Sequence, residues 1–132
     1  RVLVVDDNQD AADALVEALA SHGHAASVAY DGPSGLELAA RAHPEVAFLD
    51  IGLPVMDGYE LARRLREALD GAVKLVALTG YGQDRDRAEA RAAGFDEHLV
   101  KPVELDQILE VVRALAPAPV PTPPPASAAA AP

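Results

Sequence analysis

The chain of 132 residues contains no cysteine, which excludes disulfide bonds and thiolate metal sites. Basic residues are scarce, 11 against 21 acidic ones, and the formal net charge is −10 at pH 7. With no cluster of lysine and arginine to offset it, this charge argues against direct binding to nucleic acid or to an anionic membrane surface. No uncharged apolar run approaches the roughly 18 residues of a membrane span, and the first residues lack the pattern of a signal peptide. We therefore expect a soluble, cytoplasmic protein.

Strand-like and helix-like segments alternate along the first 115 residues. Short apolar runs predict strands at 2–5, 25–30, 46–49, 73–78 and 97–100. Apolar residues at helical spacing predict helices between Asn8 and Gly23, between Pro33 and Pro44, and at 59–69, 84–93 and 104–115. This order predicts an α/β fold, a doubly wound five-stranded parallel sheet with five helices on its two faces. The flavodoxin-like strand order 2-1-3-4-5 is favoured, because it places ligands beside strands one and three.

The helix expected at 59–69 has a clear apolar stripe and a clear charged face. Leu61, Ala62 and Leu65 are predicted to point inward. Three arginines of the same segment are predicted to point outward, namely Arg63, Arg64 and Arg66.

The composition changes abruptly at about Ala116. Residues 117–132 hold seven of the eleven prolines, and the rest are almost all alanine, valine, serine or threonine. Such a segment cannot bury a core, so we expect an extended, disordered Pro/Ala-rich tail or linker at 116–132. Residues 1–115 are then the folded domain.

Charged residues follow three of the predicted strands. Asp6 and Asp7 come directly after the first strand, Asp50 after the third, and Lys101 after the fifth. In a parallel sheet these groups meet at one edge, where crowded carboxylates repel one another unless a counter-charge is present. Mg²⁺ prefers such oxygen ligands, and a lysine ammonium suits a phosphate oxygen. The alternative is a purely structural role, in which Asp6 and Asp7 only cap the first helix and Lys101 is an ordinary surface charge.

In these residues and their spacing the chain resembles the receiver domain of two-component response regulators. The resemblance covers residues 1–115 and rests on V-D-D-N at 5–8, D-I-G-L-P-V-M-D-G-Y-E-L at 50–61, A-L-T-G at 77–80, A-G-F-D at 93–96 and L-V-K-P at 99–102. It implies that Asp50 is the phosphoacceptor, which takes a phosphoryl group from a phosphohistidine. The implied partner is a histidine kinase or a histidine phosphotransfer protein.

The resemblance also implies a Mg²⁺ site. Asp7 and Asp50 would bind the ion directly, together with the main-chain carbonyl of Gly52, and Asp6 would act through a metal-bound water. Asp57 lies beyond the loop that follows the third strand, so we interpret it as a helix cap or turn residue and not as a ligand.

The remaining implied roles fall on both sides of the phosphoacceptor. Thr79 would hydrogen-bond the phosphoryl group and Lys101 would pair with it. Pro54 and Gly58 would shape the loop after Asp50, and a cis peptide bond would precede Pro102. Two positions tune the lifetime of the phosphoryl group in this family, and here they are Gly52 and Tyr81. The two residues are expected to change that lifetime in opposite directions, so no lifetime is predicted.

Signal transmission is expected to use Thr79 and His98. The family usually has tyrosine or phenylalanine where this chain has His98. Movement would reach the face made by residues 84–115, which could contact an effector domain or form a homodimer. The chain would then be a phosphoacceptor and switch that promotes its own phosphoryl transfer and dephosphorylation, and not an enzyme acting on a diffusible substrate.

Two alternatives belong to other functional classes. One is an interaction module of the same fold that is independent of phosphorylation; loss of Asp50 or Lys101 would favour it, and both are present. The other is a Mg²⁺-dependent phosphohydrolase with an aspartyl nucleophile. Those enzymes usually carry Asp-x-Asp after the first strand, where this chain has Asp6-Asp7-Asn8.

Overall fold

The computed structural model describes residues 1–53, 55–69, 73–80 and 84–115. The predictions made for Pro54, Tyr81 and the tail at 116–132 lie outside these residues. Five parallel strands form one sheet in the order β2-β1-β3-β4-β5, which confirms the flavodoxin-like fold. The strands are β1 (Val2–Val5), β2 (Ala26–Ala29), β3 (Val46–Asp50), β4 (Lys74–Thr79) and β5 (Glu97–Val100). The helices are α1 (Gln9–Ser21), α2 (Gly32–Ala42), α3 (Gly58–Leu69), α4 (Asp84–Ala93) and α5 (Leu105–Leu115).

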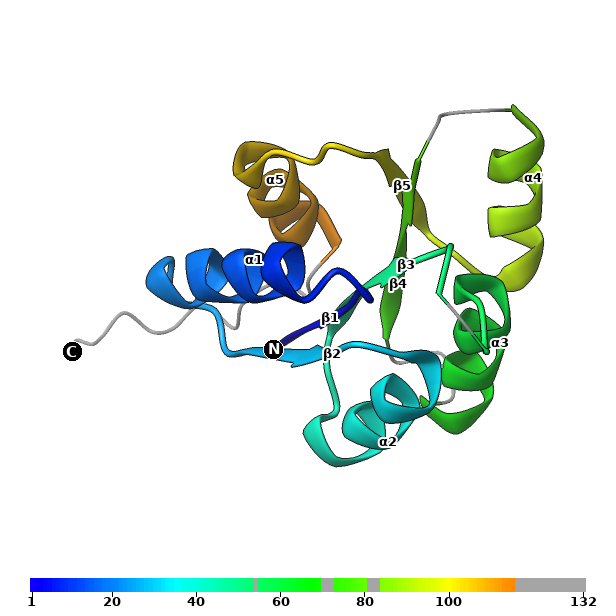
Figure 1. Ribbon diagram of the computed structural model, residues 1–132, viewed down its shortest axis with the longest axis horizontal. Helices are drawn as coiled ribbons and strands as arrows, with labels where there is room; N and C mark the ends of the chain where they lie inside the picture. The colour runs from blue at the N-terminus through cyan, green and yellow to red at the C-terminus, as the bar shows by residue number, and fades with distance from the viewer. Residues whose placement is uncertain (54, 70–72, 81–83, 116–132) are drawn as a thin grey trace, which may run out of the picture.

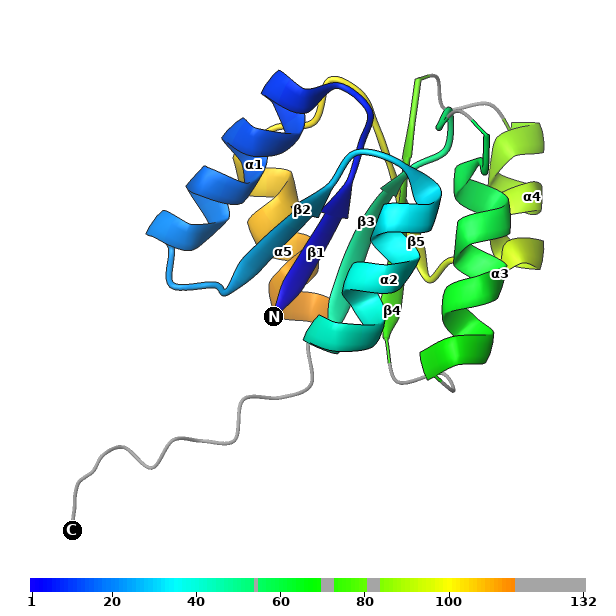
Figure 2. The same cartoon turned by 60° about the horizontal axis from the view of Figure 1, so that its bottom comes forward.

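The sheet separates two apolar cores. Helices α1 and α5 cover one face, and α2, α3 and α4 cover the other (Figures 1 and 2). Successive strand residues point to opposite faces, so even-numbered residues such as Val4 and Phe48 pack toward α1 and α5. Odd-numbered neighbours such as Leu3 and Leu49 pack toward α2, α3 and α4. Burial on both faces explains why the central strands are continuous apolar runs.

Side-chain caps fix the beginnings of three helices. The Asn8 Oδ1 accepts a hydrogen bond from the Ala11 N–H at 3.1 Å and so caps α1. Asp31 caps α2 in the same way, and the hydrogen bonds from Ser34 lower the pKa of its carboxyl group. Asp57 accepts from the Glu60 N–H at 2.9 Å, which confirms its interpretation as a cap.

The inward stripe of α3 is confirmed, but the prediction for Arg66 is wrong. Leu61, Ala62 and Leu65 are fully buried. Arg66 is half-buried and donates to the main-chain carbonyls of Gly94 and Val73 and to the carboxylate of Asp96. Its side chain therefore ties the last turns of α3 to β4 and to the turn between α4 and β5.

The helices of the described part of the chain are too short or too polar to cross a membrane. Among the histidines, His22 and His43 are exposed at helix ends, and His24 is partly buried.

Candidate functional site

Three carboxylates meet at the carboxyl edge of the sheet. Val5 of β1 pairs with Leu49 of β3, so the aspartates that follow them emerge side by side. One carboxylate oxygen from each of Asp6, Asp7 and Asp50 lies within 4.8 Å of the others. Asp6 and Asp50 are 5% and 8% exposed, whereas Asp7 is exposed. The carboxylates of Asp6 and Asp50 are therefore recessed, whereas Asp7 is open to solvent.

Lys101 follows β5, the outer strand of the sheet, and reaches this cluster along the carboxyl edge. Its Nζ lies 3.1 Å from Asp6 Oδ2 and 3.2 Å from Asp50 Oδ2, and the peptide bond to Pro102 is cis, as the resemblance implies. Burial acts to lower the pKa of Lys101, but the charge of Asp50 and the hydrogen bond and charge of Asp6 outweigh it and raise that pKa. The ammonium therefore stays protonated while it bridges two carboxylates.

Main-chain hydrogen bonds hold the two buried carboxylates in place. The Asn8 N–H donates to Asp6 Oδ1 at 3.0 Å, and the Gly52 N–H donates to Asp50 Oδ1 at 3.0 Å. Each carboxylate thus keeps one oxygen on the backbone and turns the other toward Lys101. In each case the chain turns directly after the strand, so that the N–H group two residues later can hold the carboxylate in place.

Thr79 ends β4 beside the lysine. It is 4% exposed, and its Oγ1 donates to the Leu99 carbonyl at 3.5 Å. The Lys101 N–H donates to the Thr79 carbonyl at 2.7 Å, so the two residues share one backbone contact. His98 is half-buried on β5 opposite Ala77, below this edge of the sheet, and its role as a switch stays a prediction.

The loop between β3 and α3 is folded tightly against the phosphoacceptor candidate. The Gly58 N–H donates to the Ile51 carbonyl at 3.0 Å, and a Cβ on Gly58 would lie only 2.6 Å from the Asp50 carbonyl oxygen. Only glycine permits this approach, which gives the predicted role of Gly58 a steric reason. Within this loop Val55 has φ 69° and is 99% exposed, which no pattern in the sequence indicated.

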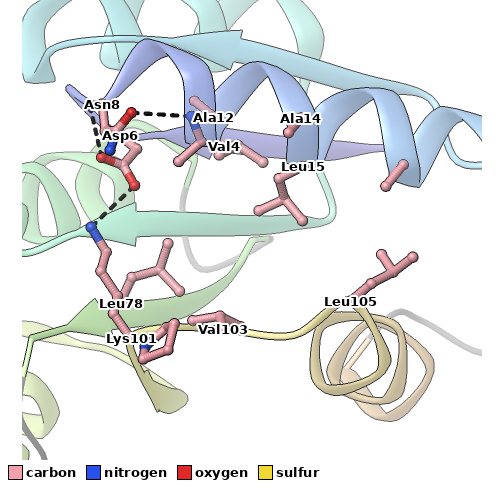
Figure 3. Close-up of a pocket in the computed structure, with 13 residues that line it drawn as sticks. Val4, Asp6, Asn8, Ala12, Ala14, Leu15, Leu78, Lys101, Val103 and Leu105 are labelled. Atoms are coloured by element: carbon pink, nitrogen blue, oxygen red, sulfur yellow. Dashed lines mark hydrogen bonds and ion pairs between the residues drawn. The ribbon is translucent and has the colours of Figure 1, made fainter.

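A mostly apolar cavity of about 620 Å³ opens beside the cluster, between α1 and the segment that leads from β5 into α5. Figure 3 shows Asp6 and Lys101 at one end of it, with Leu15 and Leu105 farther along. Val4 and Leu78 of the sheet form its floor. The charged cluster is therefore reached along an apolar surface.

The donor set suits a hard cation. Three carboxylates against one ammonium leave a net negative charge, and every available side-chain ligand is an oxygen. The carboxylates of Asp6, Asp7 and Asp50 therefore suit Mg²⁺ as ligands. Thr79 and Lys101 follow β4 and β5 at the same edge of the sheet, where they can contact an anionic group.

A family model for the response regulator receiver domain matches residues 2–113. The chain belongs to this family. Among curated relatives, the mycobacterial response regulator MprA from Mycobacterium leprae is 35% identical over 115 residues, which is 87% of this chain and 50% of that protein. An uncharacterised 14.6 kDa protein of Leptolyngbya boryana is 36% identical over 113 residues, 85% of this chain and 86% of that protein. The receiver thus spans about half the length of MprA and most of the second relative.

Solved receivers have the same fold. The chemotaxis protein CheY4 of Vibrio cholerae gives a TM-score of 0.81 at 27% identity, covering 86% of this chain and 96% of that one. A response regulator from Burkholderia pseudomallei gives a TM-score of 0.77 at 30% identity, covering 86% of this chain and 65% of that one. That structure contains a phosphorylated aspartic acid and a calcium ion. In this receiver domain, the carboxylate cluster stands at the edge where doubly wound sheets bind ligands.

Proposed function

We propose that this receiver domain accepts a phosphoryl group on Asp50 in a Mg²⁺-dependent reaction and changes the conformation of its 84–115 face. The observation that carries the proposal is the ammonium of Lys101 held 3.2 Å from Asp50 within a cluster of three carboxylates. This arrangement offers a nucleophile, oxygen ligands for a cation, and a separate positive charge for a phosphoryl oxygen.

The chemistry is a transfer between two proteins. A carboxylate oxygen of Asp50 forms a bond to phosphorus, the P–N bond to the donor histidine breaks, and the imidazole leaves with the bonding electron pair. Asp7, Asp50 and the Gly52 carbonyl would hold Mg²⁺ directly and Asp6 would hold it through a water, and the ion would supply positive charge to the phosphoryl oxygens. Lys101 exchanges a carboxylate for a phosphoryl oxygen, which keeps its charge paired throughout.

Thr79 links the chemistry to the rest of the domain. A phosphoryl group adds negative charge and acceptor oxygens, and the Thr79 hydroxyl at the end of β4 supplies a donor for one of them. That contact would draw the segment after Thr79 inward and open the face at 84–115, with His98 following from β5. The domain then acts as a switch read by an effector domain or a second copy, and not as an enzyme with a diffusible substrate.

The partner is a protein that carries phosphohistidine, a histidine kinase or a phosphotransfer protein. Asp50 is 8% exposed, so a donor must insert its phosphoryl group into the recess. The apolar cavity beside Asp6 and Lys101 offers side chains of such a donor a surface to bury.

The test is phosphorylation by acetyl phosphate with Mg²⁺, followed by intact-mass measurement. We expect one base-labile phosphoryl adduct that EDTA prevents and that Asp50→Asn lacks. Asp57→Asn is the matched control, because Asp57 lies in the same loop but caps α3. An adduct that persists in Asp50→Asn would assign the acceptor elsewhere.

The same preparation tests the metal site. Asp7→Ala should weaken Mg²⁺ binding more than Asp6→Ala, because we propose direct ligation for Asp7 and a water-mediated contact for Asp6. Titration of Mg²⁺ by calorimetry measures both affinities. Equal losses would contradict this division of roles.

A further inference from the structure

Val55 violates two local rules at once. Its φ of 69° lies in the left-handed region, where a β-branched side chain is a genuine outlier. Its side chain is also 99% exposed, although the residue is apolar. Glycine or asparagine would adopt this backbone more readily, and a polar residue would suit the exposure better. Neither the backbone nor the solvent therefore favours valine at this position.

The surrounding loop holds Val55 in this conformation. Met56, the next residue, packs so closely under Gly32 that a Cβ on that glycine would lie 2.8 Å from the Met56 Cβ. Gly58 is hydrogen-bonded to Ile51 and lies against the Asp50 carbonyl. With the residues that follow it held in this way, Val55 keeps its side chain in solvent, and the strain persists because tertiary contacts over-determine it.

Val55 is close to Asp50, the proposed phosphoacceptor. Val55 precedes Gly58 by three residues, so their Cα atoms are at most about 11 Å apart, and Gly58 touches Asp50. An ordinary protein interface covers roughly 800 Å² on each partner, a patch of about 16 Å radius. An interface of that size centred on Asp50 therefore reaches Val55, whereas a small phosphodonor need not touch it.

The neighbourhood of Val55 has the composition of an interface anchor and its rim. A depression of about 360 Å³ is lined by Val55 and Met56 together with charged residues of α3, namely Glu60, Arg63 and Arg64. Glu60 pairs with both arginines, at 3.6 Å and 2.8 Å, and Asp57, which also lines the depression, balances the remaining positive charge beside Val55. An apolar group surrounded by paired charges is the arrangement found where one side chain dominates binding.

We propose that Val55 is an apolar anchor that determines recognition of the protein phosphodonor, binding an apolar surface next to the donor's phosphohistidine. The proposal rests on the phosphoacceptor role proposed for Asp50. It explains why a strained, exposed valine occupies the loop: the side chain is buried only in the complex. The domain thus has lower stability at Val55 in exchange for faster transfer from a protein donor.

The experiment compares two donors on the full chain. Acetyl phosphate is the small donor, and the protein donor is the purified kinase or phosphotransfer protein of the same genome that phosphorylates the wild-type chain fastest. Val55→Gly should raise the melting temperature by several degrees, because the left-handed backbone is no longer strained. Its kcat/KM with the protein donor should fall about tenfold or more, with labelling by acetyl phosphate unchanged. Val55→Leu, which keeps an apolar side chain, should retain most of the transfer.

His43→Gly is the matched control. His43 also has a left-handed backbone, with φ 48°, but it follows α2 at the opposite edge of the sheet from Asp50. This variant should gain stability without any change in transfer from either donor. Unchanged transfer from the protein donor to Val55→Gly would overturn the anchor, and so would an equal fall with both donors or an equal fall in His43→Gly. If acetyl phosphate labels none of the proteins, the phosphoacceptor role itself fails.

Discussion

Replacing Arg66 tests whether the fold depends on a side chain that joins three elements. Arg66 Nε and Nη2 donate to the Gly94 carbonyl at 3.0 and 2.6 Å, and Nη1 donates to the Val73 carbonyl at 2.6 Å. Nη2 also pairs with Asp96, whose Oδ2 accepts from the Leu75 N–H at 2.8 Å. Arg66→Met keeps much of the apolar stem and removes all of these donors.

The expected loss follows from what each bond contributes. A hydrogen bond to a charged group is worth about 1.5–3 kcal/mol net when it is well buried. Arg66 and Asp96 are 25% and 30% exposed, so water replaces part of what is lost, and about 1 kcal/mol for each of the three acceptor groups is reasonable. We therefore expect Arg66→Met to lower the free energy of unfolding by about 3 kcal/mol, a large share of the roughly 5–15 kcal/mol of a typical domain.

Urea denaturation measures this loss, with the slope m compared between proteins to confirm that the same surface is exposed. Arg63→Met is the matched control on the same helix. Arg63 is 56% exposed and its one ion pair with a described residue is to Glu60 at 3.6 Å, so its loss should be about 0.5 kcal/mol or less. Asp96→Asn and the double variant complete a cycle, in which a coupling of about 1 kcal/mol or more is expected. If Arg66→Met costs no more than Arg63→Met, the network does not stabilise the domain.

Two further predictions concern the switch and the tail. Thr79→Ala should still accept phosphate, because nucleophile and metal ligands remain, but amide exchange on the 84–115 face should respond weakly to beryllofluoride; an undiminished response would remove Thr79 from the switch, and a response lost in His98→Ala would assign that role to the histidine. Deletion of residues 117–132 should leave the melting temperature and Asp50 phosphorylation unchanged, because that segment has no core-forming pattern; a clear drop in melting temperature would show that the tail docks on the domain.

The architecture was predictable because each element has a strong period. The strands are uninterrupted apolar runs, since both faces of the sheet are covered, and the helices place Ala12 and Leu19 or Leu61 and Leu65 on one side. Most observed boundaries fall within one residue of those predicted, because caps such as Asn8 are readable from the sequence. The strand order then follows from the alternation of elements and the rules of chain connection.

The candidate site was predictable for a related reason. Asp6, Asp50 and Lys101 each follow a buried strand closely, so the parallel register alone brings them to one edge. The sequence could not show that Lys101 bridges the carboxylates of Asp6 and Asp50, because that contact depends on side-chain reach across β3 and β4. Nor could it show the left-handed backbone of Val55, which the packing of Met56 and Gly58 imposes.

Arg66 shows where pattern reasoning reaches its limit. Helical spacing gives the direction of a side chain about the axis of α3, and by that measure Arg66 lies at the flank of the buried stripe, about 40° from Ala62 and about 60° from Arg63. Its position near the end of the helix puts it beside the turn at Gly94, where the absence of a Cβ leaves room for the arginine stem, since a Cβ there would lie 3.0 Å from Arg66 Cγ. Most of its acceptors are main-chain carbonyls, which every residue carries and which leave no signature in a sequence. The presence of Asp50 and Lys101 at one edge of the sheet can be anticipated from sequence, because the parallel strands bring both residues there, whereas contacts between charged groups and the backbone become visible only once the chain is folded.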